Sequence, residues 1–226
     1  MPKILALDTT SEFGSLALAD GGQVVDEVLL HAPEGFGQIL FQRVERLLER
    51  NGWKLADIDC FAGASGPGSF TGVRVGLAAL KGLAEAQGKP AVAVSNLKAI
   101  ASFGGAPGLR AVFLDARRGQ IYGAVYDAQL AVISPETTAN FGAWLAGLPE
   151  GNLELLSTNF APFVAALAGT RFEHAPRREA PRALAAAIAR IARLRLDAGQ
   201  AEDPASIDAN YVRRSDAELY WKDGTV

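Results

Sequence analysis

A glycine-rich stretch, residues 65–75 (SGPGSFTGVRV), constrains the fold of this chain more than any other feature. A short apolar run at 60–65 precedes it and predicts a buried strand. After it, apolar residues recur at helical spacing as far as the Gly88-Lys89-Pro90 stop. The stretch is therefore predicted to be a strand-to-helix turn, in which glycines allow a positive φ or a close backbone approach.

Turns of this kind can bind anions through the free N–H groups at the helix start. The Walker pattern does not match, because Gly72 is followed by Val73 and Arg74 rather than by Lys and a hydroxyl residue. The dinucleotide fingerprint fails by one residue, since its third glycine falls at position 72. Two readings stay open at this point: a ligand loop, and a turn that only packs a helix closely on a sheet.

Composition limits the classes of protein to which the chain can belong. It has 226 residues, 49% of them hydrophobic, which suits one large or two small packed domains. A net charge of −3 argues against a large basic surface for nucleic acid. Cys60 is the only cysteine, so we expect no intrachain disulfide and a core position for its thiol. With no signal peptide and no apolar run of membrane length, we expect a cytoplasmic protein without membrane contact.

The pattern of strands predicts two similar halves. Apolar strands at 4–7, 15–19 and 24–30 open the chain, and Asp8, Thr9 and Thr10 follow the first of them. These polar residues either cap a tight turn or face a ligand. A glycine-rich linker at 104–108 precedes a second strand–turn–strand unit at 110–126, whose turn carries Asp115 and Arg117. We expect these two residues to organise that hairpin and contacts between the halves.

Two amphipathic helices are predicted besides the one after the glycine turn. The first covers 36–51, and the second covers 181–196 with Leu184, Ile188, Ile191 and Leu194 on one face. The second carries the only basic cluster evident in the linear sequence. Its arginines form either a solvated face or a contact with RNA phosphates. They are Arg182, Arg190, Arg193 and Arg195.

Three segments carry a resemblance to a known family: GPGSFTGVRVGLAALKGLA at 66–84, LDARRGQIYGAVY at 114–126 and YVRRS at 211–215. In this order and spacing they resemble the TsaB (YeaZ) family over nearly the whole chain. The resemblance implies an α/β fold of two actin-like lobes (the ASKHA, ribonuclease H-like superfamily), the second smaller and more divergent. We place the lobes at residues 1–103 and 104–226.

The resemblance also implies a function and partners. Such a subunit is not an enzyme, but an accessory that pairs with the TsaD threonylcarbamoyltransferase. A TsaE-type ATPase joins the assembly, which modifies the tRNA adenosine beside the anticodon. We expect the chain to form a homodimer when it is alone and to contact tRNA only through the complex. We expect no tightly bound cofactor, and we consider ATP or ADP only at an interface with a partner.

The resemblance assigns candidate site residues. Asp8, Thr9 and Thr10 would form a vestigial phosphate loop. The partner interface is expected on the helices at 36–50 and 71–87. The residues assigned to the interface or to the structural motif are Phe36, Leu40, Val44, Gly66, Pro67, Gly68, Ser69, Phe70, Thr71, Gly72, Arg74 and Gly76.

No catalytic or metal site is expected, because the sequence offers no histidine pair at helical spacing and no nucleophile with a nearby base. Phe36 stands where many relatives have a histidine, and no histidine lies between His31 and His174. Two alternatives stay open. One is an ATP-dependent small-molecule kinase of the same superfold, and the other is a glycoprotease-like peptidase.

Overall fold

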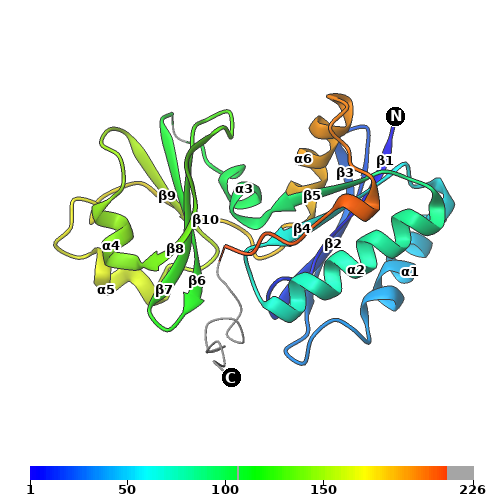
Figure 1. Cartoon of the computed structure of the whole chain (residues 1–226), viewed down its shortest axis with the longest axis horizontal. Coiled ribbons are helices and arrows are strands. Elements are labelled where there is room, and N and C mark those ends of the chain that lie inside the picture. Colours follow the sequence, from blue (N-terminus) through cyan, green and yellow to red (C-terminus); the bar gives the residue numbers. More distant parts are fainter. Residues whose placement is uncertain (106, 213–226) are drawn as a thin grey trace, which may run out of the picture.

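The computed structural model describes residues 1–105 and 107–212 of the chain. Two five-stranded sheets lie side by side, and helices cover their faces (Figure 1). The strand orders are β3-β2-β1-β4-β5 in the first sheet and β10-β9-β6-β7-β8 in the second. The predicted α/β class is confirmed.

In the first sheet, an antiparallel meander is extended by two strands parallel to the first strand. The strands are β1 (Lys3–Asp8), β2 (Phe13–Asp20), β3 (Gln23–His31), β4 (Cys60–Gly66) and β5 (Ala91–Ser95). Parallel neighbours require a crossover connection. Here α1 (Leu40–Arg50) leads from β3 to β4, and α2 (Phe70–Gln87) leads from β4 to β5.

The second sheet repeats this arrangement. Its strands are β6 (Leu109–Arg117), β7 (Gln120–Tyr126), β8 (Val132–Asn140), β9 (Leu153–Ser157) and β10 (Arg177–Glu179). The first three form an antiparallel meander, while β9 and β10 continue the sheet in parallel with β6. Taken in chain order, both sheets therefore have the same topology, which confirms the duplication that the two opening hairpins suggested.

Alternation along the strands gives the first sheet two different faces. Leu5 and Leu7 point to the face that α1 and α2 cover, whereas Ile4 and Ala6 point to the face that α6 (Ala185–Asp197) covers. The α6 face of the sheet is rich in alanine, and so is the helix, so the helix can pack closely. No helix of the described residues is long and apolar enough to span a membrane.

Helices also join the two sheets. α3 (Asn96–Ala101) follows β5 and contacts strands of both sheets, and its apolar residues belong to a core that includes residues of β1 and β6. On the far face of the second sheet, α4 (Phe141–Ala146) and α5 (Val164–Leu167) cover an aromatic core around Phe113. Three short 3₁₀ helices complete the fold: η1 (Leu55–Asp57), η2 (Ala161–Phe163) and η3 (Pro204–Ser206).

The N-terminus of α6 is capped by side chains of the first sheet. Ser15 Oγ accepts hydrogen bonds from the backbone N–H groups of Leu184 (3.0 Å) and Ala185 (2.9 Å). Glu27 Oε1 accepts one from the N–H of Ala186 at 2.7 Å. Burial raises the pKa of Glu27, although the Ala186 N–H and the charge of Arg190 act in the opposite direction. Strand residues far away in sequence thus satisfy N–H groups that a helix leaves unpaired at its start.

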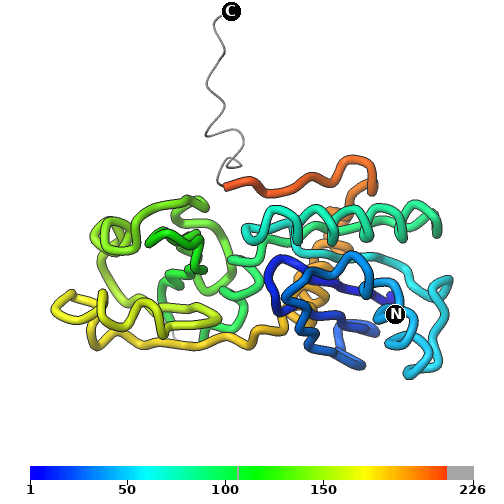
Figure 2. The backbone as a smooth tube through the Cα atoms, turned by 90° about the horizontal axis from the view of Figure 1, so that it is seen from below, coloured from blue at the N-terminus to red at the C-terminus, as the bar shows by residue number. Residues whose placement is uncertain are grey.

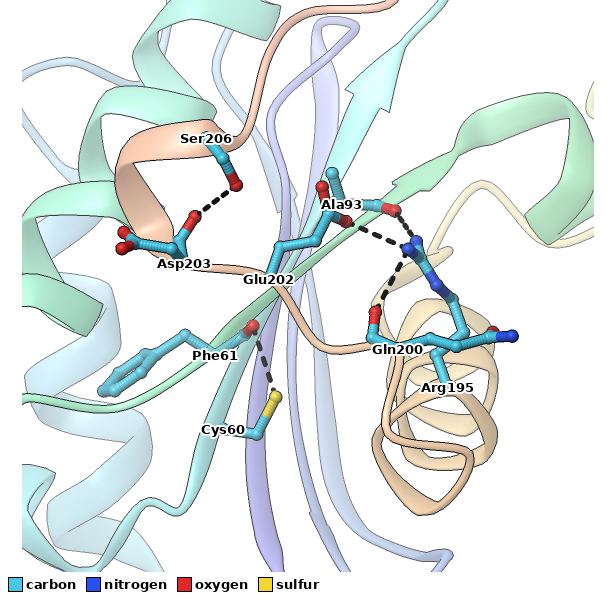
Figure 3. Close-up of polar contacts among 8 residues, drawn as sticks. All are labelled: Cys60, Phe61, Ala93, Arg195, Gln200, Glu202, Asp203 and Ser206. Atoms are coloured by element: carbon cyan, nitrogen blue, oxygen red, sulfur yellow. Dashed lines mark hydrogen bonds and ion pairs between the residues drawn. The ribbon is translucent and has the colours of Figure 1, made fainter.

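After α6, a segment that we call the strap (residues 200–212) returns across the first sheet. Glu202 exchanges backbone hydrogen bonds of 2.8 and 3.0 Å with Ala91 at the edge of the sheet. Arg195 fixes this crossing, because its guanidinium donates to Ala93 O at 2.7 Å and to Glu202 Oε1 at 2.9 Å (Figure 3). The strap then runs alongside α2 (Figure 2).

This arrangement qualifies the predicted division into residues 1–103 and 104–226. That division separates the two sheets, yet α6 and the strap follow the second sheet in sequence and pack on the first. The boundary between structural domains stays a prediction.

Two predicted helices need correction. α1 begins at Leu40 rather than at 36, and α6 begins at Ala185 rather than at 181. Leu194, expected on the buried face, is 68% exposed. The buried face of α6 is set largely by alanines, which a search for large apolar residues passes over.

Candidate functional site

The loop after β1 lies at the junction of the two sheets and is turned inward. Asp8, Thr9 and Thr10 are 3%, 2% and 4% exposed. Asp8 Oδ1 accepts hydrogen bonds from Thr10 N at 2.9 Å and from Thr10 Oγ1 at 2.7 Å. Burial raises the pKa of Asp8, and the hydrogen bonds from Thr10 and Asn96 only partly oppose this. The structure thus brings the predicted phosphate-loop residues together, with their polar groups paired within the chain.

The glycine turn packs directly on this loop. Ser69 N donates to Thr10 O at 2.7 Å, and Thr9 Oγ1 donates to Gly72 O at 2.7 Å. A Cβ atom at Gly72 would lie 2.2 Å from Thr9 O, and one at Gly68 would lie 2.5 Å from Thr10 O. These glycines are needed because two stretches of backbone touch here. Ser69 caps α2, because its Oγ accepts a hydrogen bond from Gly72 N at 3.3 Å.

Asn96, the first residue of α3, joins the loop to the turn. Its side chain is 1% exposed, and its Nδ2 donates to Thr10 Oγ1 at 2.8 Å and to Asp8 Oδ2 at 3.3 Å. Its Oδ1 accepts from Gly66 N at 3.2 Å. The ends of β1, β4 and β5 are therefore held by one amide group.

Glu136 of β8 provides the corresponding link between the two sheets. Its Oε1 accepts hydrogen bonds from Tyr126 OH at 2.9 Å and from Ser95 Oγ, and its Oε2 accepts from Asn210 Nδ2 at 2.6 Å. Ser95 ends β5 of the first sheet, Tyr126 belongs to the second, and Asn210 belongs to the strap. Burial and the charge of Glu136 raise the pKa of the Tyr126 hydroxyl, which therefore stays protonated. We call these four residues the Glu136 cluster.

Sequence reasoning missed the Glu136 cluster and Asn96. Glu136 lies in a region with weak periodicity, and an isolated carboxylate on an edge strand gives no motif. Only the pairing of β7 with β8 brings it beside Tyr126.

The end of the strap forms an exposed aromatic patch with the start of α2. The rings of Phe70 and Tyr211 have centroids 5.6 Å apart. Arg74 lies over the Phe70 ring at 3.6 Å, and its Nε donates to Tyr211 OH at 2.9 Å. Phe70 and Tyr211 are 40% and 46% exposed. Two predicted interface residues, Phe70 and Arg74, therefore do lie at the surface.

Three other predicted interface residues do not. Phe36, Leu40 and Val44 are 2–3% exposed and pack in the core between α1 and the first sheet. They have a structural role in the core, and a contact of these three residues with a partner stays a prediction. Phe41, on the outer side of α1, is 58% exposed instead. For Gly66, Pro67, Gly68, Ser69, Thr71, Gly72 and Gly76, all in or after the glycine turn, contact with a partner stays a prediction.

The second hairpin behaves as expected within the sheet. Arg117 N donates to Asp115 Oδ1 at 2.7 Å, and Arg117 itself has a positive φ of 64° in the turn. The two residues thus organise the hairpin. Residues 213–215 of the motif at 211–215 lie outside the described residues.

Residues 1–105 and 107–212 contain no group of three or more His, Cys, Asp or Glu side chains placed to hold a metal ion. His31 stacks on Phe13 with ring centroids 4.6 Å apart. Cys60 is fully buried, as expected, and burial and the charge of Asp59 raise the pKa of its thiol to about 12. A thiol with this pKa is poorly nucleophilic at neutral pH.

Comparison with known proteins gives a consistent family. The family model described as TsaD, tRNA N6-adenosine threonylcarbamoyltransferase, matches residues 31–176. The tRNA threonylcarbamoyladenosine biosynthesis protein TsaB of Bacillus subtilis is 32% identical over 157 residues, which cover 68% of this chain and 69% of the relative. TsaB of Escherichia coli is 38% identical over 128 residues, 55% of this chain, and the match spans only about half (54%) of that relative.

Solved structures support the same fold. The structure of YeaZ from Pseudomonas aeruginosa superposes with a TM-score of 0.79 at 24% identity, covering 93% of this chain and 100% of that one. An activator of 2-hydroxyisocaproyl-CoA dehydratase from Clostridium difficile, solved with bound ADPNP, superposes with a TM-score of 0.51 at 11% identity, over 88% and 97% of the two chains. The sequence matches and the shared fold together show that this chain belongs to the TsaB (YeaZ) family.

Proposed function

We propose that this chain is a non-catalytic partner subunit in the biosynthesis of tRNA threonylcarbamoyladenosine. It pairs with a TsaD-type threonylcarbamoyltransferase and orders that subunit by means of its first lobe. A TsaE-type ATPase joins the assembly in the cytoplasm, and the chain forms a homodimer when no partner is present.

The observation that carries the non-catalytic role is the packing of the Asp8–Thr10 loop. In the superfamily that the chain resembles, this loop faces nucleotide phosphates. Here the Thr9 and Thr10 hydroxyls donate to the chain itself, and the glycine turn covers the loop with backbone contacts. Phosphate binding would require those hydrogen bonds to break first. ATP or ADP is therefore proposed only at an interface with a partner.

The outer side of α1 and the Phe70–Arg74–Tyr211 patch are the surfaces that we propose for the partner contact. Aromatic side chains and arginine are enriched among the residues that dominate binding energy at protein interfaces. Phe41 and Phe70 are the exposed aromatic residues of α1 and α2.

Size-exclusion chromatography with light scattering tests the proposal, on the chain alone and mixed with the TsaD-type subunit of the same organism. A one-to-one complex that replaces the free species is expected, and Phe41→Ala is expected to weaken it. If no complex forms even with ATP and the TsaE-type subunit present, the proposed function is wrong. The kinase alternative predicts instead a higher melting temperature of the isolated chain in millimolar Mg-ATP.

A further inference from the structure

A shallow depression of about 280 Å³ lies between α1 and the edge strand β3. Its floor is apolar, formed by Val28 and Leu47, and three arginines stand around it: Arg43, Arg46 and Arg50. It is separate from the junction of the two sheets and from the glycine turn.

The arginines around the depression are close neighbours on one helix. Arg43 and Arg46 are three residues apart, and Arg46 and Arg50 are four apart, so each pair lies on the same side of α1. Like charges at these spacings destabilise a helix by about 0.2–0.5 kcal/mol per pair. A bound anion would remove this repulsion.

Among the described residues, Arg50 is the one of these three arginines that has an acidic partner. Arg50 Nε donates to Asp26 Oδ2 at 2.8 Å, and Asn51 Nδ2 donates to the same oxygen at 2.8 Å. Partial burial acts to raise the pKa of Asp26, but these hydrogen bonds outweigh it and leave the pKa below its ordinary value. Within residues 1–105 and 107–212, the side chains of Arg43 and Arg46 have no hydrogen-bond or ion-pair partner.

The arginines near α6, which the sequence offered as a contact for RNA, differ in this respect. Arg193 pairs with Asp197 at 2.9 Å, Arg195 holds the strap, and Arg182 lies over the Phe13 ring at 4.3 Å. These guanidinium groups are used within the chain. The fourth, Arg190, is exposed, and its charge acts on the pKa of Glu27. Arg43 and Arg46 differ from Arg182, Arg193 and Arg195 because, among the described residues, nothing pairs with their charge.

We propose that the depression bounded by Arg43, Arg46 and Arg50 binds phosphate groups of the tRNA backbone when the chain is assembled with its partner. This inference rests on the proposed function, since tRNA is the anionic macromolecule that the pathway handles. Guanidinium groups bind phosphate oxygens in pairs of parallel hydrogen bonds. A depression of about 280 Å³ suits a backbone phosphate and its sugar rather than a folded surface.

The depression stays accessible beside the proposed protein interface. Residues i and i+2 of an α-helix are separated by about 200° of rotation about the helix axis, so Arg43 points about 160° away from Phe41. The arginines therefore face the β3 side of α1, while Phe41 faces the opposite flank. One helix can thus contact a protein on one flank and RNA on the other.

The test is the salt dependence of tRNA binding by the assembled complex. Binding of end-labelled tRNA is measured by fluorescence anisotropy at KCl concentrations from about 50 to about 300 mM. Each contact between the protein and a phosphate contributes about −0.7 to −0.9 to the slope of log K against log salt concentration. Each contact that a variant loses therefore makes the slope shallower by that amount. R43A/R46A is therefore expected to flatten the slope by about 1.4–1.8 and to weaken binding at least about tenfold. R43K/R46K should retain the slope and lose part of the affinity, because lysine keeps the charge without the planar fork.

The control is K54A/K89A, which removes the same charge from surface positions outside the depression and should leave the slope unchanged. The proposal is overturned if R43A/R46A changes neither slope nor affinity. It is also overturned if the variant loses the TsaD-type subunit while tRNA binding is unaffected, since the depression is then a protein contact. If wild-type chain forms no complex, the proposed function fails, and the same variants titrated as isolated chains decide the RNA contact.

Discussion

Replacing Glu136 by alanine should destabilise the whole chain and loosen the strap. The carboxylate accepts hydrogen bonds from Ser95, Tyr126 and Asn210, which lie in both sheets and in the strap. Hydrogen bonds to charged groups contribute about 1.5–3 kcal/mol each, and less where the group is only partly buried, as Glu136 is. The buried Tyr126 hydroxyl would also be left without its acceptor.

We therefore expect Glu136→Ala to lower the free energy of unfolding by about 2–4 kcal/mol. For a chain of this size, about 2–4 °C of melting temperature is lost per kcal/mol, so the midpoint should fall by roughly 10 °C. Urea titration and calorimetry measure both quantities. Glu136→Gln, which keeps an acceptor oxygen, should cost less than half as much, and Glu34→Ala, an exposed carboxylate without a partner among the described residues, should stay within about 0.5 kcal/mol.

A second readout distinguishes a link between sheets from a local contact. Asn210 also donates its backbone N–H to Ser65 O at 2.8 Å, so hydrogen exchange at Asn210 reports whether the strap stays in place. Exchange there should accelerate in Glu136→Ala. The reasoning is refuted if the free energy of unfolding of Glu136→Ala lies within about 0.5 kcal/mol of the wild-type value, as expected for the surface control Glu34→Ala, and hydrogen exchange at Asn210 is unchanged.

Further predictions address the turn, the helix cap and two buried groups. Gly72→Ala should unfold or severely destabilise the chain, because its Cβ would meet a carbonyl oxygen at 2.2 Å, whereas Gly82→Ala, in the same helix with nothing within 4 Å, should stabilise it by about 0.5–1 kcal/mol in urea titrations. Ser15→Ala should cost about 1–3 kcal/mol, since it leaves two buried N–H groups of α6 unpaired; an unchanged urea midpoint would contradict this. Asp8 has a raised pKa, so the folded state binds its proton more tightly than the unfolded state, and its contribution to stability falls as the pH rises above 3.8. The urea midpoint of Asp8→Asn should therefore rise relative to that of the wild type as the pH is raised from about 4 towards neutrality, where the unfolded carboxyl is ionised. If the two midpoints change in parallel with pH, this prediction is wrong. Cys60 should react with a thiol reagent only after unfolding, and rapid labelling of the native chain would contradict its burial.

The parts of the fold that the sequence predicts well are those set by local periodicity. β4, the glycine turn and α2 appear where the apolar spacing and the Gly88 stop place them. β8 was missed because its alternating residues are mostly polar or small and it lies at a sheet edge, where one side faces solvent. The packing of α6 on the first sheet could not be predicted from the sequence either. It depends on Ser15 and on alanine contacts between segments about 170 residues apart.

The candidate site shows why a sequence motif and its structural role can differ. Asp8, Thr9 and Thr10 have the composition of a phosphate loop, and composition alone counts their hydroxyl groups as available donors. A threonine hydroxyl has one proton to donate. Thr9 gives its proton to Gly72 O, and Thr10 gives its proton to Asp8, so neither hydroxyl is left to donate to a phosphate. Asp8 is a neighbour of Thr10 in the same turn, whereas Gly72 O comes into range of Thr9 because glycines at 68 and 72 let α2 approach the loop. The glycines that make the motif resemble a ligand loop are therefore the residues that close it, and the chain's ligands are better sought on the outer flanks of α1 and α2.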